Sequence, residues 1–246
     1  MQIKSLLGAL AIAASVVGAQ ASQAASKAPA KAAAKSPSAA EWQAIFAVDK
    51  STLASTGRNQ FFVLEPGHVS VFDGAGTHLV ITVLAKTELV DGVTTRVVEE
   101  RETKDGALVE ISRNYFVISD RDSAVYYFGE NVDMYKGGKV VSHEGSWRSG
   151  VDGARFGLMM AAHPVLGMRY QQEVAPKVAM DRMDFVSTTD AVKVPAGSYT
   201  GCIRTEETTP LEPGAKEYKR YCPGVGLVED GDLKLVQLLG ATAKKP

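Results

Sequence analysis

Cysteine and histidine are scarce in this chain: its 246 residues include two cysteines and four histidines. Zinc and copper centres usually draw several ligands from these residue types, so the chain has little with which to build one. The motifs G-x-S-x-G, H-E-x-x-H and G-x-x-x-x-G-K-[ST] are also absent. The enzyme classes that these motifs mark therefore receive no support.

An excess of basic residues is also missing, because 27 Lys and Arg face 28 Asp and Glu and leave a net charge of −1. Nucleic-acid binding usually needs a basic face, so we expect no nucleic-acid partner. After the first 24 residues no apolar run is long enough to span a bilayer. We therefore expect no transmembrane anchor once a leader has been removed.

The N-terminus has the pattern of a secretory signal peptide. Lys4 precedes an apolar run over residues 6–17, and Ala19-Gln20-Ala21 matches the small-residue cleavage rule. Ser22-Gln23-Ala24 is a second possible cleavage site, and no cysteine follows that could carry a lipid. We predict a signal peptide over residues 1–24 and a periplasmic or secreted protein.

The next segment, residues 25–40, is built from Ala, Lys, Pro and Ser and predicts a disordered linker. Residues 41–246 have the size of a single domain. A short helix is expected at its start, because Ser36-Pro37-Ser38 offers a cap and Trp42, Ile45 and Phe46 share one helical stripe.

Beyond Gly57 the pattern changes to short β-rich runs separated by turn residues such as Asp91-Gly92, Asp105-Gly106 and Gly137-Gly138. No crossover helices are indicated between these runs, so the strands should be antiparallel. The expected strands are 79–90, 93–102, 107–119, 124–128, 132–135, 168–174, 183–187, 199–206, 217–222, 226–229 and 233–239. We predict a mainly β fold, one large curved antiparallel sheet that forms a half-barrel or a partly closed barrel, with the short N-terminal helix.

The two cysteines, Cys202 and Cys222, lie on either side of the turn sequence Leu211-Glu212-Pro213-Gly214. Their midpoint is residue 212, so a hairpin folded at this turn places them opposite each other. Directly opposed Cα atoms are about 4.5–5.5 Å apart, which is within disulfide reach. A redox or metal-binding pair would need C-x-x-C spacing or a nearby histidine, so we predict a structural disulfide.

Two sets of neighbouring acidic residues are candidate calcium ligands. They are Asp120 with Asp122, and Glu229, Asp230 and Asp232. Neither matches an EF-hand loop, and both fall where turns are expected. We interpret them as turn carboxylates.

Residues 139–147 (KVVSHEGSW) predict a strand that carries His143 and Trp147 on one face. Gly145 between them leaves space beside the indole, so this face could line a ligand cavity. The alternative is a core face with a hydrogen-bonded histidine at its edge. Both interpretations remain open at this point.

The stretch GARFGLMMAAHP, residues 153–164, brings methionines close to a histidine. Thioethers and imidazole suit Cu(I), and Met160 and His163 could converge if Met160 begins a helical turn. Two ligands are too few for a copper site, so copper is the minor alternative and we expect no cofactor. We instead interpret Arg155, Met160 and His163 as residues at the rim of a ligand cavity. The glycine-rich segment 150–157 would be the mobile part of this rim.

Two segments carry a resemblance to a known group of proteins. VPAGSYTGCIRTEE (residues 194–207) with YKRYCPGVGLVED (residues 218–230) resembles a VP-x-G-x-[FY]-x-x-C … YAPGVGLV signature of uncharacterised secreted bacterial proteins. NQFFVLEPG (residues 59–67) resembles their opening segment. The resemblance implies a large curved antiparallel sheet, similar to the lipoprotein-carrier (LolA/LolB-like) half-barrels, and it brings no catalytic residues. Cys222 stands where the signature has alanine.

These observations lead to two hypotheses about function. The first is a non-enzymatic envelope protein that holds a lipid, another apolar or amphipathic molecule, or a segment of an envelope protein in the concave face of the sheet. Its expected binding residues are His143, Trp147, Arg155, Met160 and His163. The second is a periplasmic copper protein or a metal-dependent hydrolase whose site is assembled from distant residues. The sequence leaves open whether any reaction is catalysed.

Overall fold

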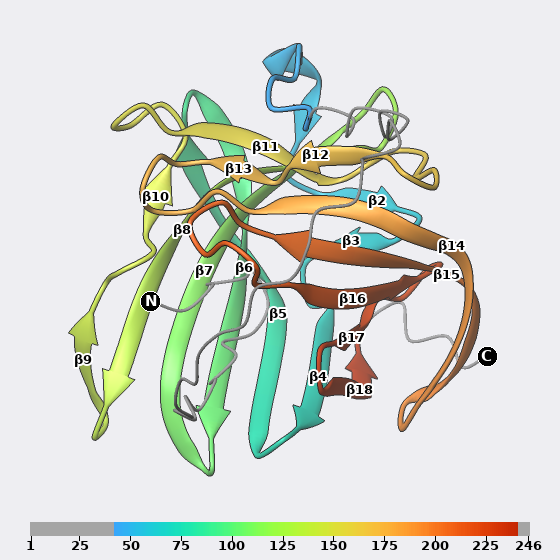
Figure 1. Ribbon diagram of the computed structural model, residues 1–246. Helices are drawn as coiled ribbons and strands as arrows, with labels where there is room; N and C mark the ends of the chain where they lie inside the picture. Colours follow the sequence, from blue (N-terminus) through green and yellow to red (C-terminus); the bar gives the residue numbers. More distant parts are fainter. Residues whose placement is uncertain (1–41, 241–246) are drawn as a thin grey trace, which may run out of the picture.

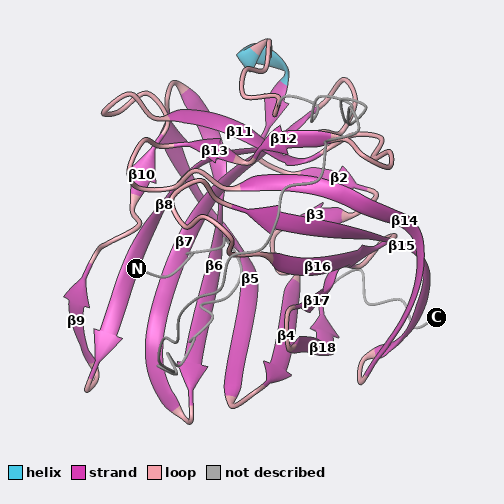
Figure 2. Ribbon diagram, in the orientation of Figure 1, coloured by secondary structure: helices cyan, strands magenta, loops and turns pink. Residues whose placement is uncertain are grey.

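Strand pairing accounts for almost all the regular structure in residues 42–240, the residues that the computed structural model describes. The exception is the single turn of 3₁₀ helix η1 (Lys50–Thr52), visible at one end of the molecule in Figure 2. The predicted signal peptide and linker lie outside the described residues. The strands are β1 (Leu53–Ala54), β2 (Gly57–Asn59), β3 (Phe62–Leu64), β4 (Val69–Gly74), β5 (Thr77–Val90), β6 (Val93–Lys104), β7 (Ala107–Ser119), β8 (Val125–Lys136), β9 (Lys139–Ser142), β10 (Trp147–Arg148), β11 (Arg155–Met160), β12 (Arg169–Gln171), β13 (Glu173–Val174), β14 (Arg182–Val194), β15 (Gly197–Thr208), β16 (Glu217–Cys222), β17 (Gly226–Asp230) and β18 (Leu233–Leu239).

The first half of the sheet is an antiparallel meander of β4, β5, β6, β7 and β8, the long strands that run side by side in Figure 1. Its turns follow the Asp-Gly pairs of the sequence. Asp91 and Gly92 have φ values of 50° and 76°, and Asp105 and Gly106 have 48° and 80°. Two successive positive φ values define the hairpin turn that matches strand twist, which explains why these pairs end strands here.

The second half is the meander of β14, β15, β16, β17 and β18, and it joins the first half where β18 pairs with β4. The joined sheet has the order β12-β14-β15-β16-β17-β18-β4-β5-β6-β7-β8-β11-β13. Its end strands, β12 and β13, are separated in the chain by Gln172 alone. The sheet therefore curls round until its two ends meet, and it forms a nearly closed barrel (Figure 1). The predicted mainly β fold and the partly closed, curved antiparallel sheet are confirmed.

We call the place where the two ends of the sheet meet the seam. The close approach of backbone segments there depends on a glycine. A Cβ built on Gly157 of β11 would lie 2.4 Å from the carbonyl oxygen of Gln172. Backbone atoms cannot move aside as a flexible side chain can, so only glycine lets β11 run against the segment that links β12 and β13.

The core fills the inside of the curve, where large side chains such as Phe72, Phe116, Tyr127, Tyr170 and Phe185 are almost fully buried. The hairpin of β2 and β3 packs inside as well, with Leu64 fully buried and Phe62 5.2 Å from Phe116 between ring centroids. Apolar burial on this scale is the main stabilising term for the fold.

The predicted N-terminal helix is wrong from Trp42 onward, and its earlier residues lie outside the described part. Residues 42–48 are extended, and Gln43 forms a parallel bridge with Tyr170 of β12. Exposure alternates along the segment with a period of two, so Phe46 packs against Tyr126 and Tyr170 while Ile45 points to solvent. The apolar residues fit this period as well as a helical stripe, and pairing with β12 decides between the two.

Two further expectations about local structure are wrong. Residues 129–131 do not form a turn, because Glu130 pairs with Asn114 of β7 and with Trp147 of β10, and β8 continues through them. Residues 155–157, the end of the predicted mobile rim, are part of β11, which lies between β8 and β13. In both places, partners on two sides supply the backbone hydrogen bonds that turn residues alone would not predict. Within residues 42–240, no helix has the length and apolar character needed to cross a bilayer.

Candidate ligand pocket

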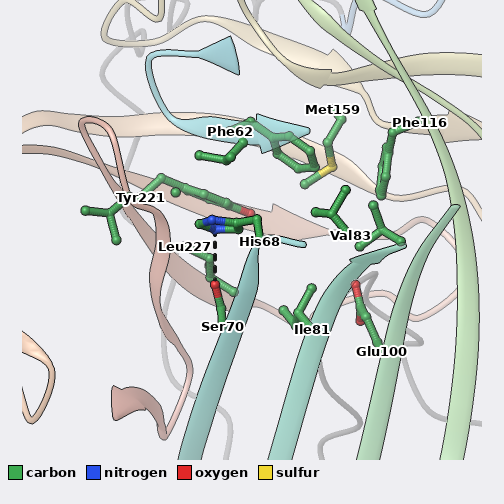
Figure 3. Close-up of a pocket in the computed structure, with 14 residues that line it drawn as sticks. Phe62, His68, Ser70, Ile81, Val83, Glu100, Phe116, Met159, Tyr221 and Leu227 are labelled. Atoms are coloured by element: carbon green, nitrogen blue, oxygen red, sulfur yellow. Dashed lines mark hydrogen bonds between the residues drawn. The ribbon is translucent and has the colours of Figure 1, made fainter. Parts of the chain in front are cut away.

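A cavity of about 50 Å³ lies inside the barrel, between β4–β7 on one side and β16–β17 on the other. We call it the interior pocket. Ile81, Val83, Val98 and Phe116 form its wall on the first meander. Figure 3 shows Phe62 and Met159 at one edge, Glu100 at the opposite edge, and His68 and Tyr221 to one side. Its lining is thus mainly apolar, with a small number of polar groups.

The register of the first meander explains which side chains face inward. Ser70 is opposite Ile81, Ile81 is opposite Glu100, and Glu100 is opposite Ser112. Directly opposed residues share a face of the sheet, so these side chains form one inward row. Val83, Val98, Asn114 and Glu130 form the next row in the same way.

His68, the residue before β4, and Ser70 of β4 are polar residues on one side of the pocket. His68 is buried, and its Nε2 lies 3.4 Å from the Ser70 hydroxyl. Burial is the largest influence on this imidazole and lowers its pKa, with Arg58 acting in the same direction. At neutral pH His68 is therefore an uncharged hydrogen-bonding group.

Behind the pocket lies a group of carboxylates around a single lysine, which we call the buried acid cluster. Its acidic members come from both halves of the sheet and from the seam, and they are Glu100, Glu102, Glu130, Glu173, Asp181, Glu207, Glu217 and Asp230. Lys219 of β16 is fully buried at its centre, with Nζ 3.1 Å from Glu207, 3.7 Å from Asp230 and 3.9 Å from Glu217.

Burial and neighbouring charges raise the pKa of several acids in the cluster and of its lysine. Burial raises the pKa of Glu100 well above its usual range, and this rise prevails over the opposing charge of Lys219. Burial and neighbouring acids also raise the pKa of Glu173, and burial is the largest cause for Asp230. Burial alone would lower the pKa of Lys219, but Asp230, Glu207 and Glu217 raise it above its ordinary value. Glu100 and Glu173 therefore hold protons at neutral pH, and Lys219 stays charged.

A second cavity, of about 250 Å³, lies outside the core near β10. Trp147, Arg148, Asn131 and Val178 contribute to its lining. Arg148 donates to Glu88 at 3.3 Å and to the Tyr115 hydroxyl at 3.1 Å, so it is already engaged. This cavity is wider and more polar than the interior pocket.

The predicted binding residues do not form one site. His143 lies in the turn between β9 and β10, exposed, with Nδ1 2.9 Å from Asp133. The predicted strand over residues 139–147 is thus interrupted at residues 143–146, between β9 and β10, and Trp147 lines the second cavity. Arg155 is exposed on β11.

Met160 and His163 also lie in different environments, one buried and the other exposed. Met160 is fully buried within β11 and does not begin a helical turn, whereas His163 is exposed beyond the end of that strand. Met159, at a shift of register in β11 between Leu158 and Met160, is the methionine that lines the interior pocket. Residues 42–240 contain no group of three His, Cys, Asp or Glu arranged to hold a metal ion.

The predicted disulfide is confirmed. Cys202 and Cys222 are bonded, with Cα atoms 4.2 Å apart, and Ile203 pairs with Tyr221 in the adjacent register position. The turn over residues 210–214 folds the hairpin as expected. Disulfides persist in oxidising compartments, so this bond is consistent with a location outside the cytoplasm.

Removing this bond gives the first testable prediction. We expect the double variant Cys202→Ala/Cys222→Ala to lose about 3 kcal/mol of unfolding free energy, because the disulfide closes a loop across 20 residues and restricts the unfolded chain. Urea unfolding of both proteins measures the difference. Equal midpoints for the oxidised wild type and the variant would show that the loop constraint contributes nothing.

The side chains that sequence reasoning missed are those of the buried acid cluster and most of the pocket wall. Asp230 was expected in a turn but lies within β17, fully buried and opposite Lys219. Comparisons of the chain with known protein families, curated proteins and solved structures find no match. The case for a function therefore comes from the geometry of the pocket.

Proposed function

We propose that this protein is a non-enzymatic binding protein of the cell envelope or the extracellular space, and that it holds an apolar or amphipathic ligand in the interior pocket. The observation that carries the proposal is the pocket itself, an apolar cavity with a few polar groups inside a nearly closed barrel. Small-molecule sites are typically concave, apolar and provided with a few orienting polar groups.

The size of the cavity defines how such a ligand would bind. About 50 Å³ accommodates the end of a chain or a small group, not a whole lipid. The ligand would therefore insert one part between Val83, Phe116 and Tyr221 and leave the remainder outside. The alternative of a metal-dependent protein has no supporting observation within residues 42–240.

Filling the pocket tests this proposal. We expect Val83→Phe to weaken binding of an apolar fluorescent probe about tenfold or more, because the added ring occupies the space that the probe would use. Over-packing should also lower the unfolding free energy by about 1–3 kcal/mol. The measurement is a fluorescence titration of each protein with 1-N-phenylnaphthylamine.

The matched control is Val80→Phe. Val80 is on the same strand, β5, but its side chain points to the opposite face from Ile81 and Val83. Probe binding should be unchanged in this variant. Native mass spectrometry of the exported protein provides a second test, and wild-type protein that neither binds the probe nor carries a co-purified ligand contradicts the proposal.

A further inference from the structure

We infer that the ligand of the interior pocket is an amphipathic cation, an alkylamine whose ammonium group is recognised by Glu100. This inference rests on the proposed function and specifies the chemical class of its ligand. It is carried by the charges that line the pocket and by those that lie directly behind it.

Glu100 is the carboxyl group that the ligand would meet. It is 6% exposed, lines the pocket, and comes from the same inward row as Ser70 and Ile81. Among the described residues that line the pocket, none is a lysine or an arginine. A carboxylate, phosphate or sulfate head group would thus meet no cation at the pocket wall.

The residues around Glu100 also favour a cationic head group over an anionic one. Glu102, Glu110 and Glu130 all act on it as like charges, and Lys219 is the one opposing charge. Lys219 is already engaged by Glu207, Asp230 and Glu217. An anionic head group would bring an unpaired negative charge into this low-dielectric region, whereas an ammonium group would pair with Glu100, which releases its proton to the solvent.

Arg96, the other buried lysine or arginine among the described residues, does not alter this balance. Arg96 is held by backbone carbonyls, with its Nε 2.8 Å from Ser55 and its Nη1 2.7 Å from Ala85. It is neither in the pocket lining nor paired with a member of the buried acid cluster. Among the described residues, the interior thus has more acidic side chains than lysine and arginine side chains.

Aromatic side chains in the pocket lining also favour a cationic ligand, independently of the carboxyl groups. Phe62, Phe116 and Tyr221 all contribute to the wall. The face of an aromatic ring attracts a positive charge, and more strongly where water is excluded. A primary ammonium is also compact enough for a cavity of about 50 Å³, while the alkyl chain suits the apolar wall.

The experiment compares three ligands with the same ten-carbon chain, decylamine, decanol and decanoate, each below its micelle concentration. Isothermal titration of the full chain at about pH 7.5 gives the dissociation constants, and at this pH the amine and the acid are both charged. We expect decylamine to bind about tenfold tighter than decanol and decanoate to bind weakest, since Glu100 can release its proton and pair with the ammonium group but the pocket wall offers no cation to a carboxylate.

Two variants test whether Glu100 causes the preference for decylamine over decanol. Glu100→Gln should lose the preference for decylamine over decanol. Glu99→Gln, whose side chain pairs with Arg113 on the other face of β6, should retain it. The wild-type ranking decides the question even if a variant folds poorly.

The outcomes separate this inference from the proposed function. Equal binding of decylamine and decanol by the wild type, or an amine preference that persists in Glu100→Gln, overturns the cationic ligand and leaves the apolar pocket intact. Failure of all three ligands to bind counts against the proposed function itself.

Discussion

Replacing Lys219 by methionine should lower the unfolding free energy by about 3–5 kcal/mol at neutral pH, among the largest effects expected of a single substitution in this chain. Lys219 is 0% exposed in its side chain and lies within 4 Å of the carboxyl groups of Glu207, Asp230 and Glu217. Methionine has a similar length but no charge. The three acids would then share a buried region without the cation that now neutralises them.

The pH dependence of this loss identifies its cause. At low pH the carboxyl groups become neutral, so they no longer need a cation and the penalty of Lys219→Met should shrink. A loss caused by altered packing alone would stay the same across the pH range. Urea unfolding of wild type and variant at about pH 5 and about pH 7.5 distinguishes the two explanations.

The matched control is Lys234→Met. Lys234 also pairs with an acid, Glu229 at 2.8 Å, but its side chain is 39% exposed. Exposed ion pairs contribute about 0–1 kcal/mol, so this variant should be close to the wild type. A similar loss in both variants would contradict the role assigned to Lys219.

Much of the architecture was predictable because it depends on local signals. The Asp-Gly pairs 91–92 and 105–106 act through the φ values that they allow, and β7, β16 and β18 begin and end where the apolar pattern indicated. The disulfide was predictable for the same reason, since the turn over residues 210–214 alone brings Cys202 opposite Cys222.

The pocket could not be predicted in this way. Glu99, Glu100, Arg101 and Glu102 follow one another in the sequence, and alternation only shows that two of them share each face. Which face becomes the inside depends on the pairing of β18 with β4, which joins residues more than 150 positions apart. Nothing local in β6 indicates that Glu100 will be enclosed and Glu99 left at the surface.

The predicted site failed for a related reason. His143 and Trp147 were expected to share a face because residues 139–147 have a strand-like pattern. The chain turns at residues 143–146, and Trp147 begins a separate strand that pairs with β8. The pairing of Trp147 with Glu130, 17 residues away in the sequence, overrides the local pattern.

Asp181 should make the protein less stable as the pH rises towards neutrality. Burial, reinforced by Glu207, raises the pKa of Asp181 to about 7, although Thr209 and Lys219 oppose the rise. An unfolded aspartate has a pKa of about 3.9, so between about pH 4 and pH 7 the folded state binds the proton and the unfolded state does not. The unfolding free energy that Asp181 contributes is therefore highest below about pH 4, and it falls by up to about 4 kcal/mol as the pH rises to 7 and above.

Asp181→Asn removes this titration while leaving a side chain of the same shape. The variant should be more stable than the wild type at about pH 8, and the advantage should diminish as the pH falls to about 5. Asp190→Asn is the opposing control, because hydrogen bonds from Ser187 and Arg220 outweigh the effect of burial and lower the pKa of Asp190. That substitution should cost stability at about pH 8, since it removes a carboxylate that the folded state stabilises. Urea midpoints of the three proteins between about pH 5 and pH 8 test both signs at once. If the wild type instead gains stability relative to Asp181→Asn as the pH rises, folding lowers the pKa of Asp181 and the prediction is wrong.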